Sequence, residues 1–256
     1  MDISKGNEKS GVGFCSEYSG YYELGNSYFW IAAHYDIVME HVTPLLKTAK
    51  RTKRIIMLDA GCGQGSMFDR LENFGKIIGL DVTEEACQCC YQKYHGRVTQ
   101  ARVENAPFAD NTFDFIFAIE TIEHVKNDLQ ALKELYRILK PKGFLVATVP
   151  AFMCLWGYHD EKYGHMLRYT KGKFSEKAKQ AGFTVREAHY VKFILFLPLL
   201  VMRKLKRLTH CEADDFYKIS PPVNNLLHKL LNVEIPVASV VDFPVGANIF
   251  TILYKK

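Results

Sequence analysis

Residues 54–65, RIIMLDAGCGQG, join an apolar segment to a turn with glycine at positions 61, 63 and 65. Residues 54–58 are mostly large and apolar, which predicts a buried strand. Glycines in alternate positions let the backbone turn sharply and let a ligand approach closer than a Cβ would allow. From Ser66 onward we expect a helix, whose unpaired N–H groups point back at the turn. This stretch therefore predicts a ligand-binding turn at the end of a strand.

The next apolar run, KIIGLD (76–81), ends in Asp81, which is placed to accept hydrogen bonds from two ribose hydroxyls. A dinucleotide-binding turn needs a glycine at its sixth position, but that position is Ser66, and the third glycine is Gly65. Asp59 precedes the turn, where its charge would repel a phosphate and attract a cation. S-adenosylmethionine carries a sulfonium, an ammonium group and a ribose but no phosphate. These residues therefore favour it over NAD, and an NAD-dependent reductase remains the alternative.

A longer series of motifs extends this pattern without a gap over residues 54–150. The motifs are DAGCGQG (59–65), GLDVTEEA (79–86), ENAPFADNTFDFIFAIETIEHV (104–125) and LKELYRILKPKGFLVATVP (132–150). With them the chain resembles the class I S-adenosylmethionine-dependent methyltransferases of the methyltransferase-11 and UbiE-like small-molecule type. The resemblance implies methyl transfer to a small-molecule acceptor, such as a hydroxyl of a glycosyl or lipid-linked substrate. A non-catalytic S-adenosylmethionine-binding partner subunit is a further alternative.

The whole chain alternates strand and helix patterns. Strands are expected near 54–58, 76–81, 97–101, 113–119, 143–149, 183–190 and 247–254, and helices near 27–49, 65–74, 83–94, 127–139 and 172–181. This alternation predicts an α/β fold, a Rossmann-like seven-stranded, mostly parallel sheet with helices on both faces. The resemblance implies that the last strand is antiparallel. Trp30 and Tyr35, on the first helix, are assigned to the core.

The domain organisation follows from segment lengths and composition. Residues 1–26, rich in Gly, Ser, Lys and Glu, are expected to be mobile, and residues 27–256 to form a single methyltransferase domain. Residues 151–171 form a substrate-side loop. Residues 191–245 are too long for a plain loop, so we expect a helical insertion that covers the substrate site as a lid.

The resemblance also implies which residues surround the cofactor. The glycine turn would line its methionine and ribose, Asp81 its ribose hydroxyls, and Val82 its adenine. Arg102 stands where the family usually carries an aspartate, which removes that side-chain acceptor for the adenine. The complete predicted set is Asp59, Gly61, Cys62, Gly63, Gly65, Asp81, Val82, Val103, Glu104, Ile119 and Glu120.

Methyl transfer from a sulfonium is an in-line displacement with a neutral leaving group, so a hydroxyl acceptor needs only alignment, a dry site and a base. Histidine is the commonest base at neutral pH. His159 and His165, in the segment LWGYHDEKYGHMLRYT (155–170), are the first candidates, and His124 in IEHV is a further one.

The same segment supplies candidate substrate contacts. Trp156 and Tyr158 would pack on the acceptor, and Arg168 would bind an anionic group. The alternative is that the polar groups of this loop satisfy one another, with Asp160 and Arg168 as an internal ion pair. His159, Asp160 and His165 lack a fixed helical spacing for a metal, so we expect no metal site.

Composition limits the partners. The net charge of +5 over 256 residues is mild, and no Lys/Arg block is interleaved with aromatics, so no nucleic acid partner is expected. Seven cysteines and no N-terminal apolar signal predict a cytoplasmic chain. Within residues 192–208, ten uncharged residues precede four cations, which indicates either a peripheral membrane contact or a lid helix packed on the core. The oligomeric state stays open.

Overall fold

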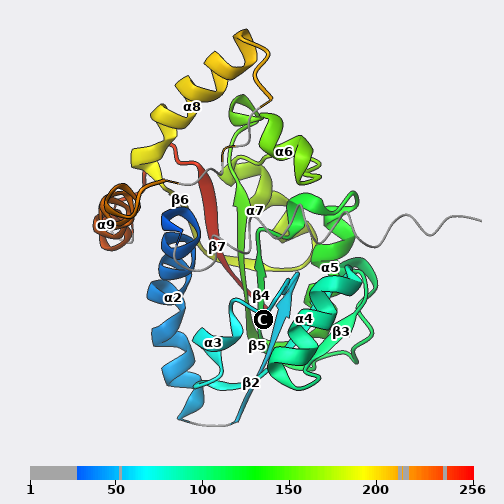
Figure 1. Ribbon diagram of the computed structural model, residues 1–256. Coiled ribbons are helices and arrows are strands. Elements are labelled where there is room, and N and C mark those ends of the chain that lie inside the picture. Colours follow the sequence, from blue (N-terminus) through cyan, green and yellow to red (C-terminus); the bar gives the residue numbers. More distant parts are fainter. Residues whose placement is uncertain (1–27, 52–53, 213–214, 216–218, 239–240) are drawn as a thin grey trace, which may run out of the picture.

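The computed structural model describes residues 28–51, 54–212, 215, 219–238 and 241–256. The predicted mobile segment 1–26 lies outside these residues. The described chain contains a seven-stranded sheet in the order β3-β2-β1-β4-β5-β7-β6 (Figure 1). Its strands are β1 (Ile55–Ala60), β2 (Gly75–Asp81), β3 (Val98–Gln100), β4 (Phe113–Ile119), β5 (Leu139–Pro150), β6 (Thr184–Val191) and β7 (Asn248–Tyr254).

The direction of the strands confirms the predicted fold class. β1 to β5 pair in parallel, and β7 runs antiparallel to both of its neighbours, β5 and β6. Every residue of β4 except Ile119 is buried, because helices cover both faces of the sheet. The sheet is therefore Rossmann-like, with its last strand reversed.

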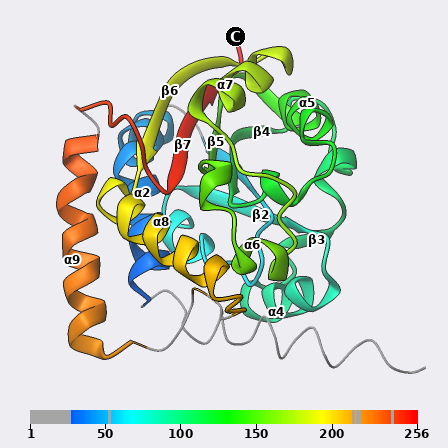
Figure 2. The same ribbon diagram turned by 90° about the horizontal axis from the view of Figure 1, so that it is seen from above.

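The helices lie on both faces of this sheet (Figure 2). They are α2 (Phe29–Lys50), α3 (Phe68–Leu71), α4 (Glu84–Tyr94), α5 (Asp128–Ile138), α6 (Tyr158–Lys162), α7 (Lys171–Gln180), α8 (Phe193–Leu208) and α9 (Pro221–Ala238). Short 3₁₀ turns are η2 (Val103–Asn105), η3 (Ile122–His124) and η4 (Met153–Leu155). Buried residues of α2 and α3 pack on one face, and those of α5 and α7 on the other.

The helix expected at residues 65–74 is much shorter than predicted. Only α3 is helical, because Gly61, Gly63 and Gly65 all have positive φ and the chain continues in turns to Met67. A helix of four residues has little dipole, so the predicted helix N-terminus contributes little to ligand binding here. The turn at residues 61–65 is formed as expected, and we call it the glycine cradle.

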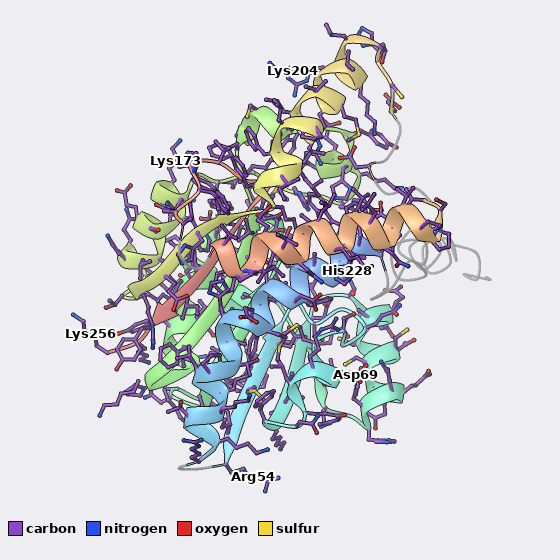
Figure 3. All side chains as sticks on the ribbon, turned by 90° about the vertical axis from the view of Figure 1, so that its left-hand side faces the viewer. Arg54, Asp69, Lys173, Lys204, His228 and Lys256 are labelled. Carbon is purple, nitrogen blue, oxygen red and sulfur yellow. The ribbon has the colours of Figure 1, made fainter. Side chains whose placement is uncertain are left out.

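The segment between β6 and β7 forms α8 and α9. α9 lies on the outside of the molecule beside α2 (Figure 3). Asn224 Oδ1 accepts a hydrogen bond from the Phe29 backbone N at 2.8 Å, and His228 Nε2 lies 2.8 Å from Asp36 Oδ2. Among the described residues no helix is long and apolar enough to cross a bilayer.

Candidate active site

The glycine turn fits tightly between its neighbours. A Cβ on Gly61 would lie 2.4 Å from Thr121 Oγ1, and one on Gly65 would lie 2.4 Å from the Tyr94 ring. Both glycines have φ near +80°, a conformation that side chains disfavour. The turn therefore leaves its backbone open toward the carboxyl ends of the strands.

Asp81 is fixed beside this turn before any ligand binds. Its Oδ2 accepts from the Gly63 backbone N at 2.9 Å. Its Oδ1 accepts from the Thr83 backbone N at 2.9 Å and from Thr83 Oγ1 at 2.8 Å. A carboxylate held by three donors keeps its position, with the remaining lone pairs free for hydroxyl groups.

A cavity of about 670 Å³ opens at the carboxyl ends of β1, β2 and β4. This is the point where the strand order reverses, the usual ligand site of open α/β sheets. All the predicted cofactor residues line it except Asp59 and Gly65. Those that line it are Gly61, Cys62, Gly63, Asp81, Val82, Val103, Glu104, Ile119 and Glu120.

Asp59 does not line the cavity; it is only 3% exposed. Burial, with the charge of Asp81 as a smaller cause, raises its pKa to about 7. At the far edge of the cavity Arg102, the residue that departs from the family pattern, pairs with Glu104 at 2.9 Å. The carboxylate of Glu104 is thus partly neutralised where the adenine edge was predicted.

One wall of the cavity comes from α2, which contributes Trp30, His34 and Tyr35. Trp30 and Tyr35 were assigned to the core, and that assignment was incomplete. A helical pattern of apolar residues shows which face is covered, but it does not distinguish a packed core from a cavity wall.

Behind this wall lies a buried cation that the sequence did not indicate. Lys192 Nζ lies 3.9 Å from the centroid of the Trp30 ring and 2.8 Å from His34 Nδ1. His34 Nε2 is in turn 2.7 Å from Thr148 Oγ1. Burial lowers the pKa of Lys192 to about 7, although Glu120 and Glu234 oppose that shift.

The three predicted catalytic histidines all line the cavity. The ring centroids of His124 and His165 are 4.7 Å apart, and those of His159 and His165 are 5.8 Å apart. Burial, followed by the charge of His165, lowers the pKa of His124 to about 4. The ring of His124 is therefore neutral at physiological pH.

Arg168 is not placed as predicted, because it serves the loop instead of the cavity. Its Nε donates to Asp160 Oδ1 at 2.7 Å, and its side chain is almost fully buried. Asp160 also accepts from His165 Nδ1 at 2.8 Å and from Arg203 at 3.0 Å. Burial would raise the pKa of Asp160, but these partners lower it well below its usual value.

The internal ion pair, the alternative interpretation of this loop, is thus what the structure contains. Two further predicted substrate contacts, Trp156 and Tyr158, also lie outside the cavity lining. Trp156 Nε1 instead donates to Glu161 at 3.2 Å. Tyr163 lines the cavity and was not singled out from the sequence.

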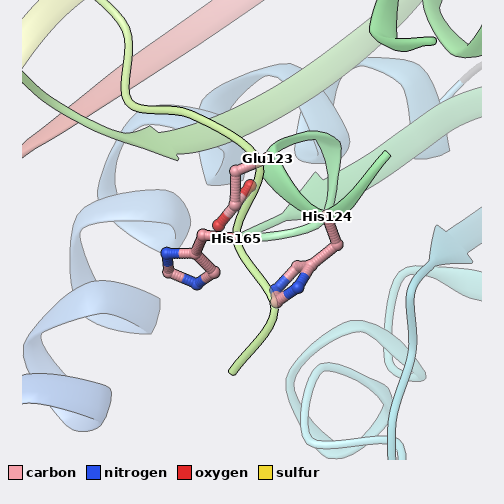
Figure 4. Close-up of side chains that lie close together, drawn as sticks. All are labelled: Glu123, His124 and His165. Atoms are coloured by element: carbon pink, nitrogen blue, oxygen red, sulfur yellow. The ribbon is translucent and has the colours of Figure 1, made fainter. Parts of the chain in front are cut away.

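Glu123 is the most unusual polar residue of the site. It is 0% exposed, and neither of its carboxylate oxygens has a hydrogen-bond partner among the described residues. Burial, with the charge of Glu120 next, raises its pKa well above the usual value. Glu123, His124 and His165 face one another (Figure 4).

Comparison with known proteins identifies the family. A model described as a methyltransferase domain matches residues 58–147. An uncharacterized protein of Methanocaldococcus jannaschii is 30% identical over 202 residues, covering 79% of this chain and 78% of that protein. A demethylmenaquinone methyltransferase of Staphylococcus epidermidis is 26% identical over 175 residues, or 61% and 71% of the two chains.

A solved structure has the same fold. It is an S-adenosylmethionine-dependent methyltransferase from Archaeoglobus fulgidus, with a TM-score of 0.56 and 17% identity over 92% of this chain and all of that one. The chain belongs to the class I S-adenosylmethionine-dependent methyltransferases. It is an enzyme of the methyltransferase-domain family with S-adenosylmethionine as its methyl donor, so the NAD-dependent alternative is set aside. The glycine cradle and the prepositioned Asp81 fit that donor.

Proposed function

We propose that this methyltransferase acts on a hydroxyl of a small molecule. The observation that supports this is the shared cavity: residues of the cofactor half, such as Asp81, and the three histidines line one space. When bound, S-adenosylmethionine supplies an electrophilic methyl group. The chain's own residues then have to orient the acceptor beside that group and receive its proton, a role that we assign to His159 and His165 because both line the cavity.

Two measurements test this proposal. Calorimetry should give micromolar binding of S-adenosylhomocysteine to the wild type, at least tenfold weaker binding to Asp81→Ala, and unchanged binding to Asp110→Ala. Asp110 is the matched control because it is an exposed carboxylate, paired with Arg137, that precedes the amino end of β4 and does not line the cavity. In the second measurement, S-adenosylmethionine with a labelled methyl group is added to cell extract, and label should enter the small-molecule or lipid fraction. Label found only in protein or nucleic acid would overturn the proposed acceptor class.

A lipid-linked acceptor is the more specific form of this proposal. One face of α8 exposes an apolar row at intervals of three or four residues: Ile194, Leu197, Val201, Leu205 and Leu208. The exposure of these side chains ranges from 41% to 78%. α9 exposes a second row: Val223, Leu226, Leu230, Val233 and Val237. Apolar surface of this extent marks an interaction face.

The charges on α8 indicate what this face meets. The sequence suggested four free cations after the apolar run, but Arg203 and Lys206 both pair with Asp215. Lys204 and Arg207 are exposed beside the apolar row, and Lys204 lies on the outward part of α8 (Figure 3). Apolar residues flanked by cations suit an anionic lipid surface. The demethylmenaquinone methyltransferase among the relatives is consistent with a lipid-like acceptor.

Co-sedimentation with vesicles tests this surface. The wild type should pellet with vesicles of anionic phospholipid and much less with zwitterionic ones. Leu197→Glu should abolish pelleting, whereas Tyr91→Glu, which changes an equally exposed apolar residue on α4, should not. Equal pelleting of the two variants would contradict the membrane contact. A cytoplasmic location stays a prediction; the cysteines among the described residues are all free thiols.

A further inference from the structure

Glu123, His124 and His165 form a compact set of potential metal ligands. One ligand atom from each lies within 4.8 Å of the others, and Figure 4 shows the three side chains close together. Ligands bonded to one ion at about 2.1 Å are separated by up to about 4.2 Å, so small side-chain rotations close the set. The first two come from η3 after β4, and the third from the loop after α6.

The buried carboxyl group of Glu123, whose two oxygens have no hydrogen-bond partner among the described residues, is a second observation that points to a ligand. A carboxylate taken out of water costs several kcal/mol unless charges or hydrogen bonds compensate. Glu123 is fully buried without a partner on either oxygen among the described residues. A cation between Glu123 and the two rings provides that compensation.

The surroundings of the two histidines orient them as ligands. Asp160 Oδ1 lies 2.8 Å from His165 Nδ1, which leaves Nε2 as the ring atom open to a cation. Such carboxylate–histidine pairs are typical supports of metal sites. Hydrogen bonds to the backbone of Gly164 and Tyr163 hold the ring of His124. The Met166 backbone N donates to the Glu123 carbonyl at 2.7 Å, which joins the two segments.

This set differs from the one weighed from the sequence. That set contained Asp160, whose two oxygens are occupied by His165, Arg168, Arg203 and the Gly157 backbone N. Asp160 therefore supports a ligand and is not one itself. The expectation of no metal site rested on spacing along the chain, whereas η3 and the loop meet only in the folded protein.

We propose that Glu123, His124 and His165 bind one divalent first-row transition-metal ion. Two imidazoles and one carboxylate are a donor set for such ions and leave coordination positions open. His124 and His165 line the cavity, so an ion held by them would be accessible from it. The set suits Mn²⁺, Fe²⁺, Co²⁺ or Zn²⁺ better than Ca²⁺, which takes oxygen ligands.

The chemical role of this ion rests on the proposed function. An ion held there would lower the pKa of an acceptor hydroxyl bound to it, and His159, which lines the same cavity and is not one of the three ligands, would receive that proton in place of His165. The oxygen then forms a bond to the methyl carbon while the carbon–sulfur bond breaks. That bond's electron pair stays on sulfur as a neutral thioether. No oxidant or reductant is consumed.

Titration of the chelator-treated protein tests the site without any turnover. Mn²⁺ followed by electron paramagnetic resonance, and Co²⁺ followed by visible absorption, should each saturate at one equivalent. His165→Ala and the isosteric Glu123→Gln should each weaken binding at least tenfold. His210→Ala, which removes an exposed histidine outside the cavity, should bind like the wild type.

The outcomes separate the two proposals. No saturable binding by the wild type, or equal binding by folded Glu123→Gln and the wild type, overturns the metal site. Circular dichroism establishes that each variant is folded. Binding of S-adenosylhomocysteine is measured on the same chelator-treated samples. If the nucleoside binds and the metals do not, the metal site alone fails. If the metals bind and the nucleoside does not, the proposed function fails instead.

Discussion

Asp59 shows how one buried carboxyl changes the pH dependence of stability. In an unfolded chain it loses its proton near pH 4, but in the fold its pKa is raised to about 7. Stability therefore falls as pH rises between these values, because the folded protein has to bury the ionised carboxylate. The full loss of stability is present above pH 7. Asp59→Asn, which carries no charge, should be more stable than the wild type at pH 8 by about 2–4 kcal/mol.

Urea unfolding at pH 4.5, 6 and 8 checks this expectation. The advantage of Asp59→Asn should shrink toward pH 4.5, because that pH is close to the pKa of the carboxyl in the unfolded chain and the folded carboxyl is protonated there. Asp242→Asn, at an exposed carboxylate, should differ little from the wild type at any of these pH values. A constant difference between Asp59→Asn and the wild type would contradict the raised pKa.

Lys192 should change stability with pH in the opposite direction to Asp59, because its buried side chain is a base. Its pKa is lowered from 10.5 to about 7, so the cost of burying the charge is complete below pH 7 and disappears as pH rises toward 10. Lys192→Met should therefore be more stable than the wild type at pH 6.5, with the advantage lost by pH 10. Thermal unfolding across this range, with the exposed Lys173→Met as control, measures the effect (Figure 3). A control that behaves like Lys192→Met would refute the assignment.

Among single residues, the sequence predicted those whose role depends on the local backbone or on a short motif. The glycine turn and Asp81 could be found because their roles depend on neighbours within one strand–turn–strand unit. Glu123 and Lys192 could not, because their properties come from burial among elements far away in the chain. Arg168 was assigned to substrate because the sequence left its pairing with Asp160 as an alternative and did not show that Arg203 of α8 joins the same carboxylate.

Among the elements, α8 has one buried residue, Arg203. Arg203 binds the Leu155 carbonyl, Asp160 and Asp215, and thereby joins α8 to the loop after β5. Removing one partner of a buried ion pair leaves the other charge uncompensated, at a cost of about 3–5 kcal/mol. Arg203→Ala should lower the free energy of unfolding by about that amount.

Arg207 on the same helix is the matched control. Its side chain is exposed and donates to the Trp156 carbonyl at 2.9 Å. Arg207→Ala should cost less than about 1 kcal/mol in denaturant unfolding. Limited proteolysis should cut α8 sooner in Arg203→Ala than in Arg207→Ala. Similar proteolysis and stability of the two variants would show that α8 is attached in another way.

Element prediction was most accurate where the pattern is long and apolar. The strand expected at 113–119 is β4 with the same bounds, because a fully buried strand leaves a continuous apolar run. The helix expected at 65–74 shrank to α3, since three positive φ angles override the helical preference of the residues after them. Local sequence thus fixes strands of the core better than the turns between them.

For the whole molecule, alternation of strand and helix was enough to predict the class of sheet, but not what surrounds the cavity. The insertion was expected over 191–245, and α8 and α9 fall within it. That α9 packs against α2, and that both inserted helices expose apolar rows, depends on packing of segments about 190 residues apart. Periodicity carries no information on such pairings.

The position of β7 has a consequence for synthesis on the ribosome. β7 lies between β5 and β6, so β6 has no strand to join until residues 248–254 have been made. α9, which holds the α2 wall of the cavity, is also made late. We therefore expect a growing chain to be unable to retain the nucleoside cofactor, and a protein ending at residue 246 to lack cooperative unfolding. Completion of the β5-β7-β6 side of the sheet would then wait until residues 248–254 have emerged from the ribosome.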